Sequence, residues 1–353
     1  MSSKTKTRLA IIGAGPSGLA AAWKLRDSDD LKITIFDKSR GVSGRAASRA
    51  RHGLRLDPGA NYFKTDLPEI SGLIHHQLPQ DDLVEIVGDI NVFDAAGTIS
   101  AGDPKLNAEK KWTYRNGIST VGKLLAQASG CEIRSGVRIG GIRQNPESQV
   151  WVLKDDAGEK LGYFDAVLIA IPAPQALDLL APEDVGIAAA LSPATYQQQW
   201  TFTFGYDSEK SSWPGESYAL INLDRGHDIA WLSRENAKPG RIPDDTLGVM
   251  AQMSPTWSLE NFERTPDELA AEVNQMVAPF LVHQTAPEWK WFDSQRWKFS
   301  LPIGRVDLEK AREVESCGAY LAGDAVVGKG RVTEALQTGL DVAERIRENI
   351  VQK

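Results

Sequence analysis

The sequence predicts a mixed α/β protein in which one chain of 353 residues builds a parallel-sheet domain and an antiparallel-sheet domain. Three stretches predict this. Residues 8–38 run from an apolar segment through a glycine turn and an Ala/Leu-rich helix to a second apolar segment, the pattern of a βαβ unit. Residues 164–171 form a continuous apolar run, as expected for a strand covered on both faces. Residues 200–204 alternate aromatic residues with threonine, as in a strand of an antiparallel sheet.

The composition argues against several classes of partner. The net charge of −7 disfavours nucleic acid or an anionic membrane surface. No apolar run approaches the roughly 20 residues that span a bilayer, and the N-terminal MSSKTKTR has no signal-peptide pattern. The two cysteines, Cys131 and Cys317, exclude a disulfide framework and a CxxC metal site. The histidines show no metal-ligand spacing. We therefore expect a cytoplasmic enzyme without a metal.

The turn of the βαβ unit matches a dinucleotide-binding motif. Gly13 allows the tight turn, Gly15 lets a pyrophosphate approach the backbone, and Gly18 lets the helix pack close to the strand. The helix N-terminus offers free N–H groups to the phosphates. Asp37 follows the second strand, where an acid accepts hydrogen bonds from ribose hydroxyls. The residues predicted to contact the dinucleotide here are Gly13, Gly15, Pro16, Ser17, Gly18, Asp37 and Lys38.

Two loops after this unit are predicted to complete the site. Residues 38–49 form a glycine- and serine-containing loop with three arginines, in which Arg45 follows Gly44 and presents a fork of donors suited to phosphate. Residues 59–62 then combine small residues, which let backbone amides approach a planar ring, with an aromatic that walls a pocket. The residues of this second loop that are predicted to contact the cofactor are Gly59, Ala60, Asn61 and Tyr62.

The rest of the chain predicts a second domain inserted into the first. Helices are expected at about residues 67–78 and 265–280, and most of the ten tryptophans lie between residues 190 and 300, where they could line a pocket for a flat or cationic substrate. The chain ends with a strand at 319–322, a Gly-Asp pair, a glycine loop and a helix at 333–351. We therefore expect a nucleotide domain of residues 1–65, 111–185 and 301–353, and a substrate domain of residues 66–110 and 186–300.

The glycine motif, the Gly44–Arg45 loop end and the C-terminal Gly323–Asp324 together resemble the Rossmann-type FAD-binding domain of the glutathione-reductase-like superfamily (GR2-like), and within it the flavin amine oxidase group. The resemblance implies non-covalent FAD. It implies that the Gly-Asp acid contacts the ribityl and pyrophosphate region, that the last helix points its N-terminus at the isoalloxazine O2, and that a backbone group near residue 137 contacts the adenine. The positions concerned are Val137, Gly323, Asp324, Arg331, Val332 and Ala335.

Within this group the chain resembles renalase, chiefly in residues 59–63, 231–241, 253–258 and 296–299. Renalases oxidise aberrant 2- and 6-dihydro isomers of NAD(P) to NAD(P)+. The flavin takes the hydride, and O2 is reduced to hydrogen peroxide. Two departures bear on substrate specificity. Ser43 stands where the family usually has glycine, and the loop at 324–330 is longer and more basic than expected.

Other activities remain open on the sequence alone. The alternatives are a flavin amine oxidase acting on a small amine or polyamine, and a flavoprotein desaturase. The sequence has no second GxGxxG with a following helix, so a nicotinamide would enter as the substrate, with O2 as the acceptor. No acid can be placed to complement an ammonium group, and no oligomeric state is predicted. The substrate-binding candidates are Tyr62, Trp231, Arg234 and Arg296, and Lys298 is the candidate for the lysine that holds a water near N5 in amine oxidases.

Overall fold

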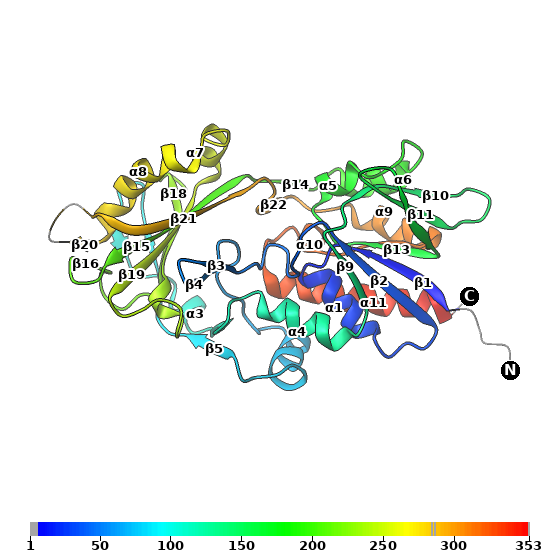
Figure 1. Ribbon diagram of the computed structural model, residues 1–353, viewed down its shortest axis with the longest axis horizontal. Helices are drawn as coiled ribbons and strands as arrows, with labels where there is room; N and C mark the ends of the chain where they lie inside the picture. Colours follow the sequence, from blue (N-terminus) through cyan, green and yellow to red (C-terminus); the bar gives the residue numbers. More distant parts are fainter. Residues whose placement is uncertain (1–5, 284, 286, 352–353) are drawn as a thin grey trace.

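The computed structural model describes residues 6–283, 285 and 287–351, which form two lobes that lie side by side (Figure 1). The first lobe contains a five-stranded, fully parallel sheet in the order β23-β13-β1-β2-β9. Its strands are β1 (Thr7–Ile12), β2 (Leu31–Asp37), β9 (Glu132–Ser135), β13 (Ala166–Ile169) and β23 (Ala319–Leu321). The predicted βαβ unit and the predicted doubly covered strand are both confirmed, because β13 is buried along its whole length.

Two layers cover this parallel sheet. Side chains alternate between the two faces of β1. Leu9 and Ile11 pack in the core on the first face, and Ala10 and Ile12 pack in the core on the second face. Three helices cover the first face, and a three-stranded antiparallel sheet covers the second. The helices are α1 (Pro16–Leu25), α4 (Thr120–Ser129) and α11 (Val332–Val351), and the strands are β10 (Ile139–Gln144), β11 (Trp151–Asp155) and β12 (Lys160–Phe164). A methyl group added at Gly339 of α11 would lie 2.2 Å from the Ser17 carbonyl oxygen, so glycine permits the close contact of α11 with α1.

The second lobe is built on a seven-stranded sheet in the order β21-β15-β19-β18-β17-β6-β7. Its strands are β6 (Ile90–Phe93), β7 (Ile99–Ser100), β15 (Gln199–Asp207), β17 (Ala219–Asn222), β18 (Ile229–Arg234), β19 (Thr246–Met253) and β21 (Trp289–Trp297). Trp200, Phe202 and Phe204 project from one face of β15 into an apolar core. Helices α7 (Pro255–Glu260) and α8 (Pro266–Val277) and the 3-10 turn η3 (Ala278–Phe280) close that core on the outer side of the lobe (Figure 1).

Two expectations need correction. The large sheet was expected to be antiparallel, but β6 runs parallel to β17, so the sheet is mixed. Strand β6 comes from residues 66–110, and it enters the sheet from a distant part of the chain. The helix expected at 67–78 is divided into α2 (Pro68–Gly72) and a π-helical turn, η1 (Leu73–Gln77), in which the Leu78 N–H donates to the Leu73 carbonyl.

Short elements connect and support the lobes. β14 (Thr195–Tyr196) pairs with β22 (Pro302–Ile303) where the chain passes between the lobes, as Figure 1 shows. The other two-stranded pairs are β3 (Arg49–Arg51) with β4 (Leu54–Leu56), β5 (Leu83–Ile86) with β8 (Lys111–Tyr114), and β16 (Ser211–Ser212) with β20 (Val282–His283). The remaining helical segments are α3 (Pro104–Asn107), α5 (Ala173–Leu177), α6 (Val185–Leu191), η2 (Glu235–Ala237), α9 (Leu308–Glu313), η4 (Val314–Cys317) and α10 (Asp324–Val327).

Candidate functional site

The glycine turn after β1 forms a cradle with space for phosphate. Gly13 has φ +110°, which favours glycine, and a methyl group added at Gly18 would lie 2.2 Å from the Gly13 carbonyl oxygen. A methyl group added at Gly15 would meet nothing within 4 Å. Helix α1 begins at Pro16, so its N–H groups face this open space. The turn therefore fits a bound pyrophosphate, as the sequence predicts.

Asp37, at the end of β2, makes two hydrogen bonds that order this turn. Its Oδ2 accepts from the Ala14 N–H at 2.8 Å, and its Oδ1 accepts from the Ser39 N–H at 2.7 Å. Lys38 is exposed beside it. The Val137 N–H donates to the Asp37 carbonyl at 3.0 Å, and residues 136–138 lie between β9 and β10 without forming a strand. Because the Val137 N–H is already used, a backbone contact from Val137 to adenine would be made by its carbonyl oxygen.

The loop of residues 43–45 forms the opposite wall of the cradle. The Ser43 N–H donates to the Ala14 carbonyl at 2.7 Å, and a methyl group added at Gly44 would lie 3.3 Å from the Gly15 Cα. Arg45 was expected to pair with phosphate. Its guanidinium instead makes a bidentate pair with Asp324, with distances of 2.7 and 2.9 Å. The loop is thereby tied to the C-terminal Gly-Asp pair.

Asp324 begins α10 and gathers three donors. Besides Arg45, the Tyr196 hydroxyl donates to Asp324 Oδ1 at 2.7 Å, and the Arg45 guanidinium lies 5.2 Å from the centre of the Tyr196 ring. Gly323 has φ +123°, and its N–H donates to Thr338 of α11. Burial and the neighbouring Asp324 carboxylate raise the pKa of Tyr196, so its hydroxyl stays protonated and donates. Three chain segments therefore meet at one carboxylate.

The start of α11 lies against the extended passage of residues 59–65. The Thr333 hydroxyl donates to the Lys64 carbonyl at 2.6 Å, and the Lys64 N–H donates to the same hydroxyl at 3.3 Å. Val332 is buried, Arg331 is exposed, and the Ala335 N–H donates to the Arg331 carbonyl in the first helical turn. The helix N-terminus predicted to face the isoalloxazine thus adjoins the residues predicted to line it.

The passage of residues 58–60 is fixed between the loop and the large sheet. A methyl group added at Gly59 would lie 2.1 Å from the Arg45 carbonyl oxygen, to which the Ala60 N–H donates at 3.1 Å. From the sheet side, Gln252 donates to the Gly59 carbonyl at 2.8 Å and Trp297 donates to the Pro58 carbonyl at 3.1 Å. Small residues are therefore required here by close packing.

Three aromatic rings form a cluster beyond this passage. The ring centres of Tyr62, Tyr218 and Trp231 are 6.1 to 6.2 Å apart in each pair. The Tyr218 hydroxyl, the Trp231 Nε1 and the Asn61 Oδ1 are buried and have no hydrogen-bond partner among the described residues. Burial raises the pKa of Tyr218 well above its usual value, so its hydroxyl remains a donor. We call Tyr62, Tyr218 and Trp231 the aromatic cluster, and Asn61 precedes Tyr62 in the chain.

A buried charge cluster lies next to these rings. Asp57 accepts from Arg241 at 2.8 Å, and Lys238 Nζ lies 2.9 Å from Glu235 and 3.8 Å from Asp57. The side chains of Asp57, Glu235 and Lys238 are fully buried, and the Arg241 side chain is only 1% exposed. Ser233 of β18 also donates to Glu235 at 3.0 Å. Both carboxylates beside the aromatic cluster are therefore already paired with cations.

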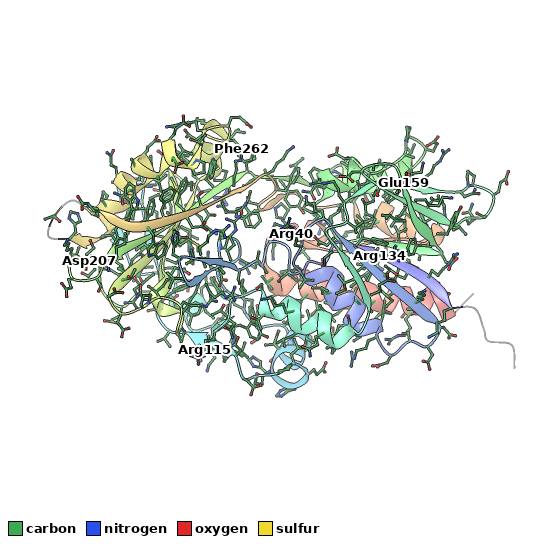
Figure 2. The ribbon with its side chains drawn as sticks, viewed as in Figure 1. Arg40, Arg115, Arg134, Glu159, Asp207 and Phe262 are labelled. Carbon is green, nitrogen blue, oxygen red and sulfur yellow. The ribbon has the colours of Figure 1, made fainter. Side chains whose placement is uncertain are left out.

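One predicted substrate residue, Arg296, and the catalytic candidate Lys298 fall outside this region. Arg296 lies on the opposite face of β21, where its guanidinium contacts Trp200 and donates to the Phe262 carbonyl. Figure 2 labels Phe262 beside α7 on the outer side of the lobe. Alternation along β21 explains the error, because its neighbour Trp297 faces Pro58. Lys298 is exposed, with its ammonium 5.5 Å from the Phe299 ring, so its predicted place near N5 is not supported.

The other substrate-binding candidates lie at or beside the aromatic cluster, and their role stays a prediction. Tyr62 and Trp231 belong to the cluster. The half-buried Arg234 is tied to it through its backbone, since its N–H donates to the Tyr218 carbonyl at 2.9 Å, and its Nε has no hydrogen-bond partner among the described residues. Sequence reasoning missed Tyr218 and the charge cluster. The i, i+3 spacing of Glu235 and Lys238 was a possible signal for one pair, but no pattern links Asp57 to Arg241.

Two negative observations apply to the described residues. Residues 6–283, 285 and 287–351 contain no cluster of three or more His, Cys, Asp or Glu side chains that could hold a metal ion. Within the same ranges, no helix is long and apolar enough to cross a membrane.

Comparison with known protein families gives a match for each of two segments of the chain. Residues 11–76 match the NAD(P)-binding Rossmann-like domain, and residues 94–347 match the flavin containing amine oxidoreductase family. A 67-residue segment is 43% identical to protoporphyrinogen oxidase 2 of Arabidopsis thaliana. That segment covers 19% of this chain and 13% of the relative.

Solved structures share the whole fold at low identity. A candidate protoporphyrinogen oxidase from Exiguobacterium sp. 255-15 superimposes with a TM-score of 0.79 and 18% identity, over 99% of this chain and 100% of that one. Cyclohexylamine oxidase from Brevibacterium oxydans IH-35A gives a TM-score of 0.72 and 14% identity, over 98% and 99% of the two chains. The family match spans well over half of the chain, so the protein belongs to the flavin-containing amine oxidoreductases and is an FAD-dependent oxidoreductase.

Proposed function

We propose that the protein is a renalase-like oxidase that converts 2- and 6-dihydro isomers of NAD(P) to NAD(P)+. The observation that carries this proposal is the aromatic cluster, whose two buried donors have no partner among the described residues, together with the buried Asn61 Oδ1 of the adjoining passage, while the nearby carboxylates of Asp57 and Glu235 are paired with cations. Bound FAD would supply the redox chemistry, in which a hydride taken from the substrate and one proton from solvent would be combined with O2 to give hydrogen peroxide.

The polar atoms of the aromatic cluster and of Asn61 suit a carboxamide. A carboxamide oxygen accepts hydrogen bonds and its nitrogen donates them. In our proposal the Tyr218 hydroxyl and the Trp231 Nε1–H donate to the oxygen, and the Asn61 Oδ1 accepts from the nitrogen. These atoms are enclosed in this structure, so the three rings must move apart to admit the flat dihydropyridine, which they then hold and shield from water. A substrate that satisfies these buried groups removes the cost of leaving them unpaired.

We further propose how the chain holds FAD without a covalent bond. The cradle of Gly13 to Gly18 and the loop of Ser43 to Arg45 take the pyrophosphate, and Asp37 contacts the ribose. Asp324 contacts the ribityl chain, and residues 59–62 with residues 331–335 contact the isoalloxazine. In this scheme residues 1–65, 111–185 and 301–353 form the cofactor domain, and residues 66–110 and 186–300 form the substrate domain. O2 is the electron acceptor.

A second candidate function is oxidation of a small amine or polyamine. Aromatic faces attract cations, and one structural relative is a cyclohexylamine oxidase. Against it, Asp57 and Glu235 are each paired with a buried cation, so neither is free to balance an ammonium group. Burying an unpaired charge is costly. The aromatic cluster therefore favours a neutral carboxamide over an amine.

Two conservative variants test the proposal. Tyr218→Phe and Trp231→Phe keep a ring but remove one unpaired donor each. Each hydrogen bond lost to the substrate raises KM for a dihydro isomer by about tenfold, with little change in FAD content. Tyr163→Phe, which removes a hydroxyl from the exposed face of β12, is the matched control. Unchanged kinetics in both pocket variants, or reduction of the flavin by amines alone, contradicts the proposal.

A further inference from the structure

The chain carries an unpaired basic surface where two distant segments meet. Residues 301–305, which include β22, pack against the glycine loop of residues 328–331. A methyl group added at Gly330 would lie 2.2 Å from a Leu301 side-chain carbon, and one added at Gly328 would lie 2.8 Å from the Gly304 carbonyl oxygen and 3.2 Å from Arg305 Cβ. Figure 1 places β22 between the two lobes and α10 in the part of the parallel-sheet lobe that adjoins it. This meeting point therefore borders both domains.

Three cations stand on these two segments. Arg305, Lys329 and Arg331 are exposed, and none of them forms an ion pair or a side-chain hydrogen bond within residues 6–283, 285 and 287–351. We call these three residues the basic junction. The net charge of the protein is −7, so a group of three unpaired cations stands apart from the rest of its surface.

The acids that could neutralise the basic junction are engaged elsewhere. The Asp324 carboxylate accepts from Arg45 and Tyr196. Asp307 accepts from two backbone N–H groups at the start of α9 and lies 3.6 Å from Lys310. Asp341, which lines a hollow together with Arg305, accepts from Gln337 at 2.8 Å, and Glu334 in the first turn of α11 is a further acid beside these segments. The three cations of the basic junction still outnumber these two acids.

The basic junction adjoins the aromatic cluster. Arg331 immediately precedes Val332, the first residue of α11. Burial and Glu109 raise the pKa of Tyr62, and the positive charge of Arg331 lowers it. The hydrogen bonds between Thr333 and Lys64 independently hold the start of α11 beside residues 62–64. A substrate whose flat ring lies on Tyr62 would extend its other end toward these cations.

We propose that the basic junction binds the pyrophosphate of a dinucleotide substrate. This inference rests on the proposed function, because the aromatic cluster must hold the dihydronicotinamide ring. Arginine forks and lysine ammonium groups bind phosphate oxygens through charge-assisted hydrogen bonds. The side chains are exposed, so the contribution is screened by salt. The longer, basic loop is therefore a specificity element for phosphate-bearing substrates.

The test compares substrates with and without a pyrophosphate. The variant Arg305→Gln, Lys329→Gln removes two of the three charges and keeps Arg331, which the proposed FAD site uses, and Lys123→Gln, Lys154→Gln removes two exposed charges on other elements of the nucleotide lobe. Two exposed contacts together give about fivefold in affinity. We expect KM for the dihydro dinucleotide to rise about fivefold in the first variant, with unchanged kcat, FAD content and KM for the dihydronicotinamide riboside. The second variant should match the wild type.

A binding assay separates this inference from the proposed function. ADP-ribose and inorganic pyrophosphate are titrated by calorimetry into the FAD-loaded wild type and both variants, at low and high salt. Weaker, less salt-dependent ADP-ribose binding in the junction variant alone supports the inference. Equal ADP-ribose affinity in all three proteins overturns it. Displacement of ADP-ribose by free pyrophosphate to the same extent in the wild type and the junction variant also overturns it. If no dihydro isomer reduces the wild-type flavin, the proposed function fails, and this binding comparison still decides whether the junction holds a pyrophosphate.

Discussion

Gly15 and Gly18 lie in the same turn but have opposite surroundings. An added methyl group meets open space at Gly15 and lies 2.2 Å from the Gly13 carbonyl oxygen at Gly18. We expect Gly15→Ala to keep the melting temperature of the apoprotein but to weaken FAD binding at least tenfold, because the methyl group occupies phosphate space. Gly18→Ala should lower the apoprotein melting temperature itself. Thermal denaturation measures the melting temperatures, and FAD titration measures the affinities. Equal melting temperatures and equal FAD affinities of the two variants would contradict this distinction between Gly15 and Gly18.

Ser43 is a strained residue in the loop that walls the cradle. It is fully buried with φ +89°, and its hydroxyl has no partner among the described residues. A left-handed conformation costs a non-glycine residue about 1 kcal/mol. Ser43→Gly should therefore raise the stability of the apoprotein by about that amount, as measured by urea unfolding. Ser39→Gly, at an exposed position with ordinary φ, serves as a comparison. A destabilised Ser43→Gly apoprotein would show that the strain account is wrong.

At the scale of single residues, the sequence predicted the cradle better than the substrate pocket. Glycines in a turn follow from local backbone requirements, so their spacing is informative. The face on which a side chain lies depends on strand register, which is why the sequence placed Arg296 on the wrong face of β21. Tyr218 and Asp57 come together only through tertiary packing between the lobes, which no local pattern records.

At the scale of elements, two helix starts depend on ionised carboxylates. Glu268 accepts from the Thr265 N–H in a capping box of α8, and Asp307 accepts from the N–H groups of Glu309 and Lys310 at the start of α9. These backbone hydrogen bonds hold the pKa values of both carboxylates below their usual range. The unfolded chain therefore binds more protons at acidic pH.

This difference in bound protons between the folded and unfolded chain determines how the stability of the protein changes with pH. Stabilisation from both carboxylates is fully present above the ordinary carboxyl pKa of about 4 and is lost as pH falls through the lower folded pKa. The melting temperature should fall on acidification from about pH 5.5 to about pH 3. Glu268→Gln with Asp307→Asn keeps the caps but cannot titrate, so its melting temperature should fall less. An identical decline in both proteins would contradict this origin.

Helix α8 shows what local signals can predict at this scale. The residues Thr265, Pro266 and Glu268 mark its start in the sequence, and the structure contains the expected capping box. The π-helical turn η1 and the parallel pairing of β6 with β17 have no such local signal. Both depend on where distant segments enter the packed lobe.

At the scale of the whole molecule, the buried charge cluster joins the lobes. Asp57 follows β4, whereas Glu235, Lys238 and Arg241 follow β18 of the large sheet. Removing one partner of a buried pair leaves an uncompensated charge and costs about 3–5 kcal/mol. We expect Asp57→Asn to lose about that much stability to urea. Asp165→Asn, which alters a half-exposed pair with Arg8, should lose about 1 kcal/mol or less. If Asp57→Asn and Asp165→Asn lose similar amounts of stability, the buried charge cluster does not have the proposed role of joining the lobes.

The two sheets draw their strands from segments that carry distinct sequence patterns. The five parallel strands lie in residues 1–65, 111–185 and 301–353, and the seven strands of the large sheet lie in residues 66–110 and 186–300. The glycine motif and the Gly-Asp pair are far apart in sequence but meet through Arg45 and Asp324. The substrate could not be predicted this way, because the aromatic cluster and the basic junction are assembled from several segments.

The most direct test of the central claim is anaerobic reduction of the purified, FAD-loaded protein in a stopped-flow spectrophotometer. The 2- and 6-dihydro isomers of NAD(P), ordinary NAD(P)H and a panel of small amines and polyamines are mixed with it separately, and the flavin absorbance is followed. Our account predicts bleaching within seconds by the isomers, with NAD(P)+ as the product and hydrogen peroxide on admission of O2. Bleaching by amines and not by the isomers would contradict it.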